Sequence, residues 1–262
     1  MFEYQQAYGK LYDSVYGTDC AHSNVKLSNF VAMRGKLYDQ HTTRLMVVGR
    51  ATNGWGEALN VNVREEYVDQ AASLFKQNDR VQPEWNMSGT YHSPYSVYDK
   101  IDADGAVTEK DAKYYLSKSS FWRVARATCY HLLPNAGKAP EEKETYWLDN
   151  IAWSNMYKIA PLKEGNPNER LIKAQQEACK DILKAEIQAL VPTHIILMTD
   201  KTWFDQYAFG EIFDCKNIIE YDSEEIIQRV YLFDNRTVLL TKRPENYSLE
   251  SFMSALKAVL IR

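Results

Sequence analysis

Residues 151–161 read Ile-Ala-Trp-Ser-Asn-Met-Tyr-Lys-Ile-Ala-Pro, an apolar strand that runs into Asn155 and Lys158. A helix is predicted next, over residues 168–190, and the apolar run at 195–198 predicts a second strand. A strand-helix-strand unit of this kind usually builds a parallel sheet with a right-handed crossover. In open α/β sheets, ligands bind at the carboxyl ends of such strands. The segment therefore predicts both the fold class and a place to look for chemistry.

The rest of the chain continues the alternation of strands and helices. A buried strand is predicted at 45–48, helices at 65–77, 120–132 and 249–259, and a hairpin or bent strand pair at 229–240. No linker interrupts this alternation. We therefore expect a single α/β domain over residues 1–262, a three-layer α/β/α sandwich with a mostly parallel sheet of roughly four strands.

Two segments stand apart from that core. Residues 1–40 are predicted to be a helical N-terminal extension of two short helices. Residues 79–118 are polar and broken by prolines and glycines, and are predicted to form a long insertion. Long loops in compact domains are often lids or binding elements.

Bulk properties exclude several classes of protein. The 262 residues carry a formal net charge of −4, with a pI of about 5.8, so there is no global basic signature for nucleic acid. The four cysteines are scattered, which fits a reduced cytoplasmic protein without disulfides or a zinc site. No apolar stretch approaches the ~20 residues needed to span a bilayer, and the first residues do not resemble a signal peptide. We expect no membrane partner.

No motif predicts a metal or a cofactor. The segment Asp102-Ala103-Asp104-Gly105 resembles the start of a calcium loop but lacks its later acidic ligands, so we interpret it as a turn. His92 is interpreted as a solvated loop residue. The sequence contains no P-loop, dinucleotide fingerprint or nucleophile elbow.

Polar side chains follow each predicted strand. They are Arg50, Asn53, Asn155, Lys158, Asp200, Lys201, Lys242 and Arg243. If the strands are parallel, all eight gather along one edge of the sheet, and five of them are cations. Such a cluster in an acidic protein predicts binding of an anion such as phosphate. The alternative is that strand ends are simply polar and solvated.

The amide of Asn155 has two interpretations. With two donors and one acceptor, it can read the hydrogen-bonding edge of a nucleobase. An asparagine at a strand end can equally be a turn former.

The central segment resembles uracil-DNA glycosylases. The run from Ser154 to Pro161, the helix that follows, Pro192 and the strand at 195–198 are similar to the middle of these enzymes. The likeness is greatest to the iron–sulfur class. The run Val47-Val48-Gly49-Arg50-Ala51 resembles the first motif of the superfamily, and the run from Thr241 to Glu245 falls where its second motif, His-Pro-Ser, would be.

This resemblance implies a four-stranded, mostly parallel sheet between helices and a hydrolase of DNA repair. It also implies a mechanism in which a nucleotide is flipped out of DNA and its base is read by Asn155. Phe121 or Trp122 would stack on the base, and Gly49 would belong to the first motif. Arg50, Lys158 and Arg243 would hold phosphate or the departing anion, and Lys242 would contribute to substrate binding.

The sequence departs from the family where catalysis would occur. Arg50 occupies the place of the catalytic acidic residue, and a guanidinium cannot act as a base. Asn53 is the nearest group that could orient water. Arg243 replaces the histidine of the second motif and could still stabilise an anion. Ile159 replaces a cluster-binding cysteine and only Cys179 lies where a ligand is expected, so we predict no iron–sulfur cluster.

Three hypotheses follow. The first is a uracil-DNA-glycosylase-like protein that binds a nucleobase, on DNA or a nucleotide, and cleaves an N-glycosidic bond. The second is a non-catalytic nucleic-acid or nucleotide binder of the same fold, which Arg50 favours. The third is an unrelated enzyme that acts on a small anionic metabolite.

Overall fold

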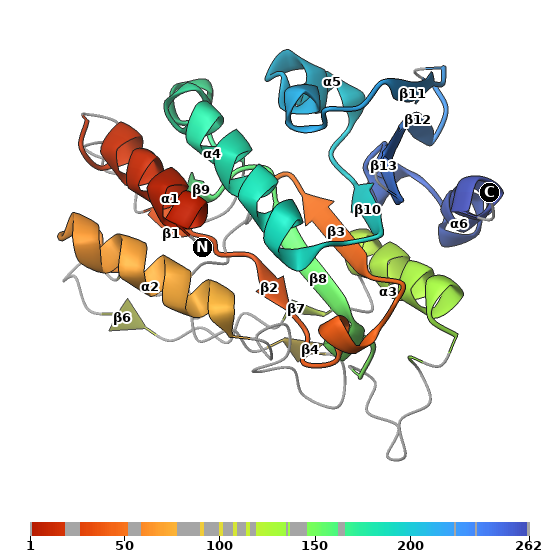
Figure 1. Cartoon of the computed structure of the whole chain (residues 1–262), viewed down its shortest axis with the longest axis horizontal. Helices are drawn as coiled ribbons and strands as arrows, with labels where there is room; N and C mark the ends of the chain where they lie inside the picture. Colours follow the sequence, from red (N-terminus) through yellow and green to blue (C-terminus); the bar gives the residue numbers. More distant parts are fainter. Residues whose placement is uncertain are drawn as a thin grey trace.

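The fold is built around one mixed sheet covered by helices on both faces (Figure 1). The computed structural model describes residues 2–18, 27–51, 59–77, 119–134, 136, 146–161, 166–222, 224–233 and 235–260, and four two-residue strands between 90 and 115. Seven strands make up the sheet, in the order β11-β12-β13-β10-β3-β8-β2. The α/β class predicted from the sequence is confirmed.

The four central strands of the sheet are parallel. They are β13 (Arg236–Thr241), β10 (His194–Leu197), β3 (Leu45–Gly49) and β8 (Ile151–Asn155). Every residue of β3 is buried, as expected for a parallel strand covered on both faces. The register pairs Gly49 with Asn155, so β3 and β8 end side by side.

Antiparallel strands extend this parallel centre on both sides, so the expected sheet of roughly four strands is too small. On one side lie β12 (Ile227–Phe233) and β11 (Asn217–Glu220), and on the other lies β2 (Met33–Arg34). The predicted strand pair at 229–240 is the β12–β13 hairpin. β2 and β11 are short edge strands outside the strand-helix-strand pattern, which is why that pattern did not reveal them.

Helices form the outer layers. Figure 1 shows α1 (Phe2–Val15), α2 (Arg64–Lys76) and α4 (Glu169–Leu190) packed together, whereas α3 (Ser120–Leu132) and α6 (Leu249–Leu260) pack together elsewhere against the sheet. The short helix α5 (Lys201–Gln206) follows β10. Ser119 and Asn168 cap α3 and α4 by accepting hydrogen bonds from backbone N–H groups of the first turn.

The second predicted helix of the N-terminal extension is wrong. Beyond α1, the chain forms β1 (Leu27–Asn29), which pairs with β9 (Ile159–Pro161), and then β2 at the sheet edge. Phe30, Val31 and Met33 are buried in the core. Pairing with distant strands thus decides the conformation of this segment, and local spacing of apolar residues does not.

Short elements complete the fold. They are the 3₁₀ turns η1 (Tyr38–Gln40), η3 (Tyr146–Asn150), η4 (Phe209–Ile212) and η5 (Pro244–Asn246), and the strands β4 (Thr90–Tyr91), β5 (Lys100–Ile101), β6 (Val107–Thr108) and β7 (Tyr114–Tyr115). The last four strands lie in the predicted 79–118 insertion, most of which is outside the described residues, as are His92 and Asp102. Among the described helices, none combines the length and apolarity required to cross a bilayer.

Candidate functional site

The strand order places a topological switch point at the carboxyl ends of β3 and β10. β3 and β10 are neighbours in the sheet. After β3 the next parallel strand along the chain, β8, lies on the far side of β3, and after β10 the next parallel strand, β13, lies on the far side of β10, so the two connections run in opposite directions. Ligands of open α/β sheets bind at such a point. Arg50 follows β3 here, and its Nε donates a 2.5 Å hydrogen bond to the backbone oxygen of Thr199, which follows β10.

Arg50 is held by an aromatic ring as well as by this hydrogen bond. Its guanidinium carbon lies 4.6 Å from the centre of the Trp203 ring, a cation–π contact. Burial, together with the nearby charge of Arg243, lowers the pKa of Arg50 to about 10, against the opposing effect of the Asp200 and Glu245 carboxylates. Arg50 is therefore charged at neutral pH and lies near Arg243.

The backbone beside Arg50 is strained. Asp200 has a φ of 75° and a ψ of 139°, in a region that side chains with a Cβ rarely adopt. Its carboxylate accepts a hydrogen bond from the backbone N–H of Thr202, and its own N–H donates to the Thr241 oxygen. Strain of this kind is often found where a chain is shaped around a ligand.

The amide nitrogen of Asn155 is buried and has no hydrogen-bond partner in the described part of the chain. The side chain is at the end of β8 and the residue is 2% exposed. Its Nδ2 is buried and donates no hydrogen bond to any of the residues that the structure describes. Leaving a buried donor unpaired costs about 1–3 kcal/mol, so such a group calls for a functional explanation.

Gly49 and Phe121 border this amide. A Cβ on Gly49 would lie 2.5 Å from Oδ1 of Asn155 and 3.5 Å from Cε2 of Phe121. Only glycine at position 49 leaves room for the amide in this place. Asn155, Gly49 and Phe121, which the sequence predicted to act together, are thus brought together by β8, β3 and α3.

Trp122 lies elsewhere, although it is adjacent to Phe121 in sequence. It is 4% exposed, and its ring packs edge-on against Trp147 and Trp153, with centroids 6.0 and 4.8 Å away. Phe121 is half-buried, and its ring is perpendicular to that of Trp122. Trp122 is a core residue, so the predicted stacking role fits Phe121 alone.

Lys158 is fully buried and its Nζ already has three acceptors within the protein, which leaves no donor for the phosphate contact predicted from the sequence. Its Nζ donates to Glu186 Oε2 at 2.9 Å, to Ser154 Oγ at 2.7 Å and to the backbone oxygen of Asn155 at 2.7 Å. Burial raises the pKa of Glu186, against the opposing effect of Lys158 and Ser154. Lys158 therefore holds the backbone oxygen of Asn155 in place through a buried hydrogen bond.

The remaining predicted residues are placed less centrally. Lys242 contacts Glu224 at 3.3 Å, and Arg243 is paired with Glu245. Asn53 lies outside the described residues. The structure adds Thr199 and Trp203 to the site. The rule that strand ends carry function points to this segment, but nothing in the local sequence shows that Trp203 underlies Arg50.

Among the residues that the structure describes, no three or more histidine, cysteine or acidic side chains group as metal ligands. Cys179 is buried, and its sulfur accepts a hydrogen bond from the Lys158 N–H at 3.4 Å.

Comparisons with known proteins add no relative: no protein-family model matches this chain, and no curated protein is significantly similar to it.

Proposed function

We propose that this protein binds a nucleobase at the carboxyl edge of its sheet, in the manner of uracil-DNA glycosylases. The observation that carries the proposal is the buried, unpaired Nδ2 of Asn155 beside Gly49 and Phe121. The amide would donate to a base carbonyl oxygen, and the half-buried ring of Phe121 would stack on the base.

Hydrolysis of an N-glycosidic bond is the reaction that this proposal suggests. It requires a group that orients or deprotonates water, and Arg50 cannot supply one because a guanidinium accepts no proton. Asn53 remains the proposed water-orienting residue. Arg243 would stabilise the departing base anion.

A non-catalytic base binder is the second candidate, and the fixed position of Arg50 favours it. Its Nε hydrogen bond to Thr199 and its contact with Trp203 place a cation where the related mechanism needs an acidic group. In that case binding would persist without bond cleavage.

The test measures both uracil release from a uracil-containing oligonucleotide and binding of uridine by calorimetry. Wild type is compared with Asn155→Ala and with Asn155→Asp, which keeps the shape but replaces the donor with an acceptor. Asn217→Ala serves as the matched control, because Asn217 is an exposed amide at the distant edge strand β11.

The outcomes separate the candidates. Release that both Asn155 variants abolish and the control retains supports the glycosylase. Binding without release, again dependent on Asn155, supports the non-catalytic binder. If wild type neither binds uridine nor releases uracil, or if the Asn155 variants behave like wild type, the proposal is wrong.

A further inference from the structure

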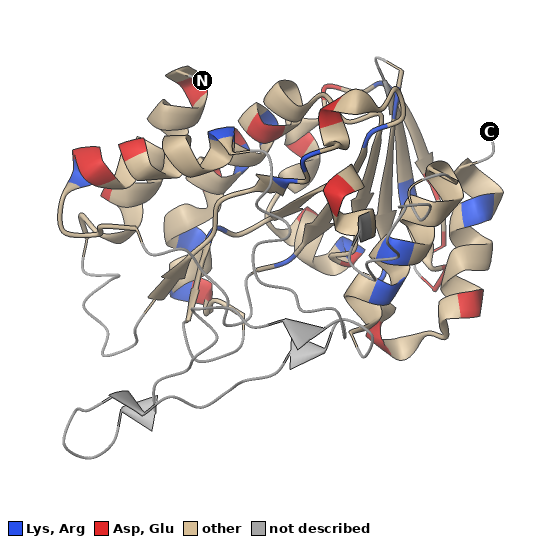
Figure 2. Ribbon diagram, turned by 90° about the horizontal axis from the view of Figure 1, so that it is seen from below, with Lys and Arg blue, Asp and Glu red and all other residues tan. Residues whose placement is uncertain are grey.

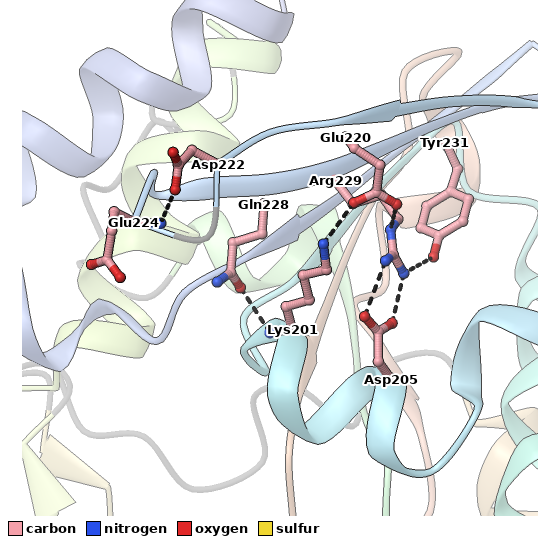
Figure 3. A network of polar contacts seen from close by, with 8 residues as sticks. All are labelled: Lys201, Asp205, Glu220, Asp222, Glu224, Gln228, Arg229 and Tyr231. Atoms are coloured by element: carbon pink, nitrogen blue, oxygen red, sulfur yellow. Dashed lines mark hydrogen bonds and ion pairs between the residues drawn. The ribbon is translucent and has the colours of Figure 1, made fainter.

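The cations that the sequence places at the carboxyl edge are mostly neutralised in the structure. Four of the five have a carboxylate partner: Lys158 with Glu186 at 2.9 Å, Lys201 with Glu220 at 2.8 Å, Lys242 with Glu224 at 3.3 Å, and Arg243 with Glu245. Figure 3 shows Lys201 and Arg229 converging on Glu220, with Arg229 also held by Asp205.

Arg50 is the exception. Within the described part of the chain it forms no ion pair with a carboxylate. Its side chain instead donates a hydrogen bond to the Thr199 oxygen and makes a cation–π contact with the Trp203 ring. Within the residues that the structure describes, its two terminal nitrogens donate to no acceptor, and neither is a fully buried unpaired atom, so both keep some exposure to solvent. Nε and the ring fix the plane of the guanidinium, which leaves a rigid fork of donors suited to an oxyanion.

The surroundings of Arg50 also favour an anion. The residue is half-buried, and Arg243 is close enough to oppose its charge. The carboxylates of Asp200 and Glu245 act on Arg50 in the opposite sense, but neither forms an ion pair with it among the described residues. A partly desolvated cation without a paired carboxylate is stabilised when an anion joins it.

A long polyanion is a poor match for this edge. The chain has a net charge of −4, and Figure 2 shows both acidic and basic positions distributed along the described ribbon. A nucleic-acid strand is bound through several phosphates by a row of free cations. Of the five predicted cations at this edge, all of them described, only the Arg50 guanidinium lacks a carboxylate partner among the described residues, which matches one phosphate group.

We propose that Arg50 is the binding site for the single phosphate of a mononucleotide, whose base occupies the Asn155 site. The nucleotide part of this assignment rests on the proposed function. Arg50 directly follows Gly49, the residue that faces Asn155, so the two sites flank the end of β3. The phosphate would lie toward β10 and Trp203, and the base toward α3 and Phe121.

The experiment is calorimetric titration with four probes: inorganic phosphate, uridine, uridine 5′-monophosphate and a short single-stranded oligonucleotide without terminal phosphates. Wild type is compared with Arg50→Gln, Arg50→Lys and Arg44→Gln. Arg44 is the matched control because it precedes β3 at its other end and its Nε also donates to a backbone oxygen, that of His41.

The monophosphate is expected to bind wild type about ten- to a hundredfold more tightly than uridine, the usual gain from charge-assisted hydrogen bonds. Arg50→Gln should abolish this gain, Arg50→Lys should retain part of it, and Arg44→Gln should retain all of it. The logarithm of the affinity should fall with the logarithm of salt concentration with a slope of about one or less, as for a single phosphate contact.

Two results would overturn the assignment. One is an unchanged gain in Arg50→Gln. The other is an oligonucleotide that binds more tightly than the monophosphate with a salt slope of several, which indicates a nucleic-acid site. The two proposals also fail separately. If uridine binding depends on Asn155 but the monophosphate binds no more tightly than uridine, only the Arg50 assignment is wrong. If inorganic phosphate binding depends on Arg50 but the Asn155 variants bind uridine as wild type does, the base site and the nucleotide assignment are wrong.

Discussion

Gly49 and Asn155 are register partners at the ends of β3 and β8, and the amide of Asn155 occupies the space that a side chain at position 49 would need. A methyl group at Gly49 would lie 2.5 Å from Oδ1 of Asn155. The absence of a side chain at one residue thereby positions the amide of the other.

Gly49→Ala is therefore expected to displace the Asn155 amide, abolish uridine binding and destabilise the fold by about 1–3 kcal/mol, as overpacking does. Both effects are measured directly, by calorimetry and urea unfolding. The control is the double variant Gly49→Ala/Asn155→Ala, in which the clash is gone. It should be more stable than Gly49→Ala alone. Equal stability of the two would show that Asn155 does not occupy this space.

Phe121 and Trp122 are adjacent in α3 but differ in burial, and we expect opposite consequences when each is replaced by alanine. Phe121→Ala should weaken base binding by about 1–3 kcal/mol, the usual contribution of stacking on one base. It should lower the stability of the protein less than Trp122→Ala does. Trp122→Ala should destabilise the protein by about 3–5 kcal/mol, because a large core ring is lost. Uridine titration and urea unfolding of both variants test this. If Phe121→Ala binds uridine as wild type does, Phe121 is not the stacking residue.

The sequence predicted the centre of the sheet because that centre is encoded locally. Buried parallel strands such as β3 and β10 read as short apolar runs, and α4 reads as a helix with apolar residues on one face. Once these strands are parallel, their carboxyl ends share one edge, which is why Asn155 and Arg50 could be placed there.

What the sequence did not reveal depends on residues far apart in the chain. The short strand β2 exists because it pairs with β8, more than a hundred residues later. The burial of Lys158 depends on Glu186, which is 28 positions away on α4 and has no local signal of its own. Charged residues are usually exposed, so Lys158 was expected at the strand end in contact with phosphate.

The end of α4 predicts a stabilising substitution. Val191 has a φ of 47° and a ψ of 52°, the left-handed conformation, although it is β-branched and precedes Pro192. Glycine adopts this conformation without steric cost, so Val191→Gly should raise the free energy of unfolding by about 1 kcal/mol. Val191→Ala keeps the Cβ, so it should raise the free energy of unfolding by less than Val191→Gly does. Urea unfolding measures both, and a glycine variant less stable than wild type would contradict the strain argument.

The buried contact of Lys158 with Glu186 predicts how the site is supported. Lys158→Met leaves the Glu186 carboxylate buried without its partner and should cost about 3–5 kcal/mol of stability. It also removes the hydrogen bond that holds the backbone oxygen of Asn155.

In the double variant Lys158→Met/Glu186→Leu, no buried charge is left without a partner, so we expect most of the stability to return. Base binding should remain weakened, because the Asn155 oxygen has still lost its donor. Urea unfolding and uridine titration of the two variants separate these effects. Recovery of both stability and binding would show that the pair only balances charge, whereas recovery of stability alone identifies Lys158 as the residue that positions Asn155.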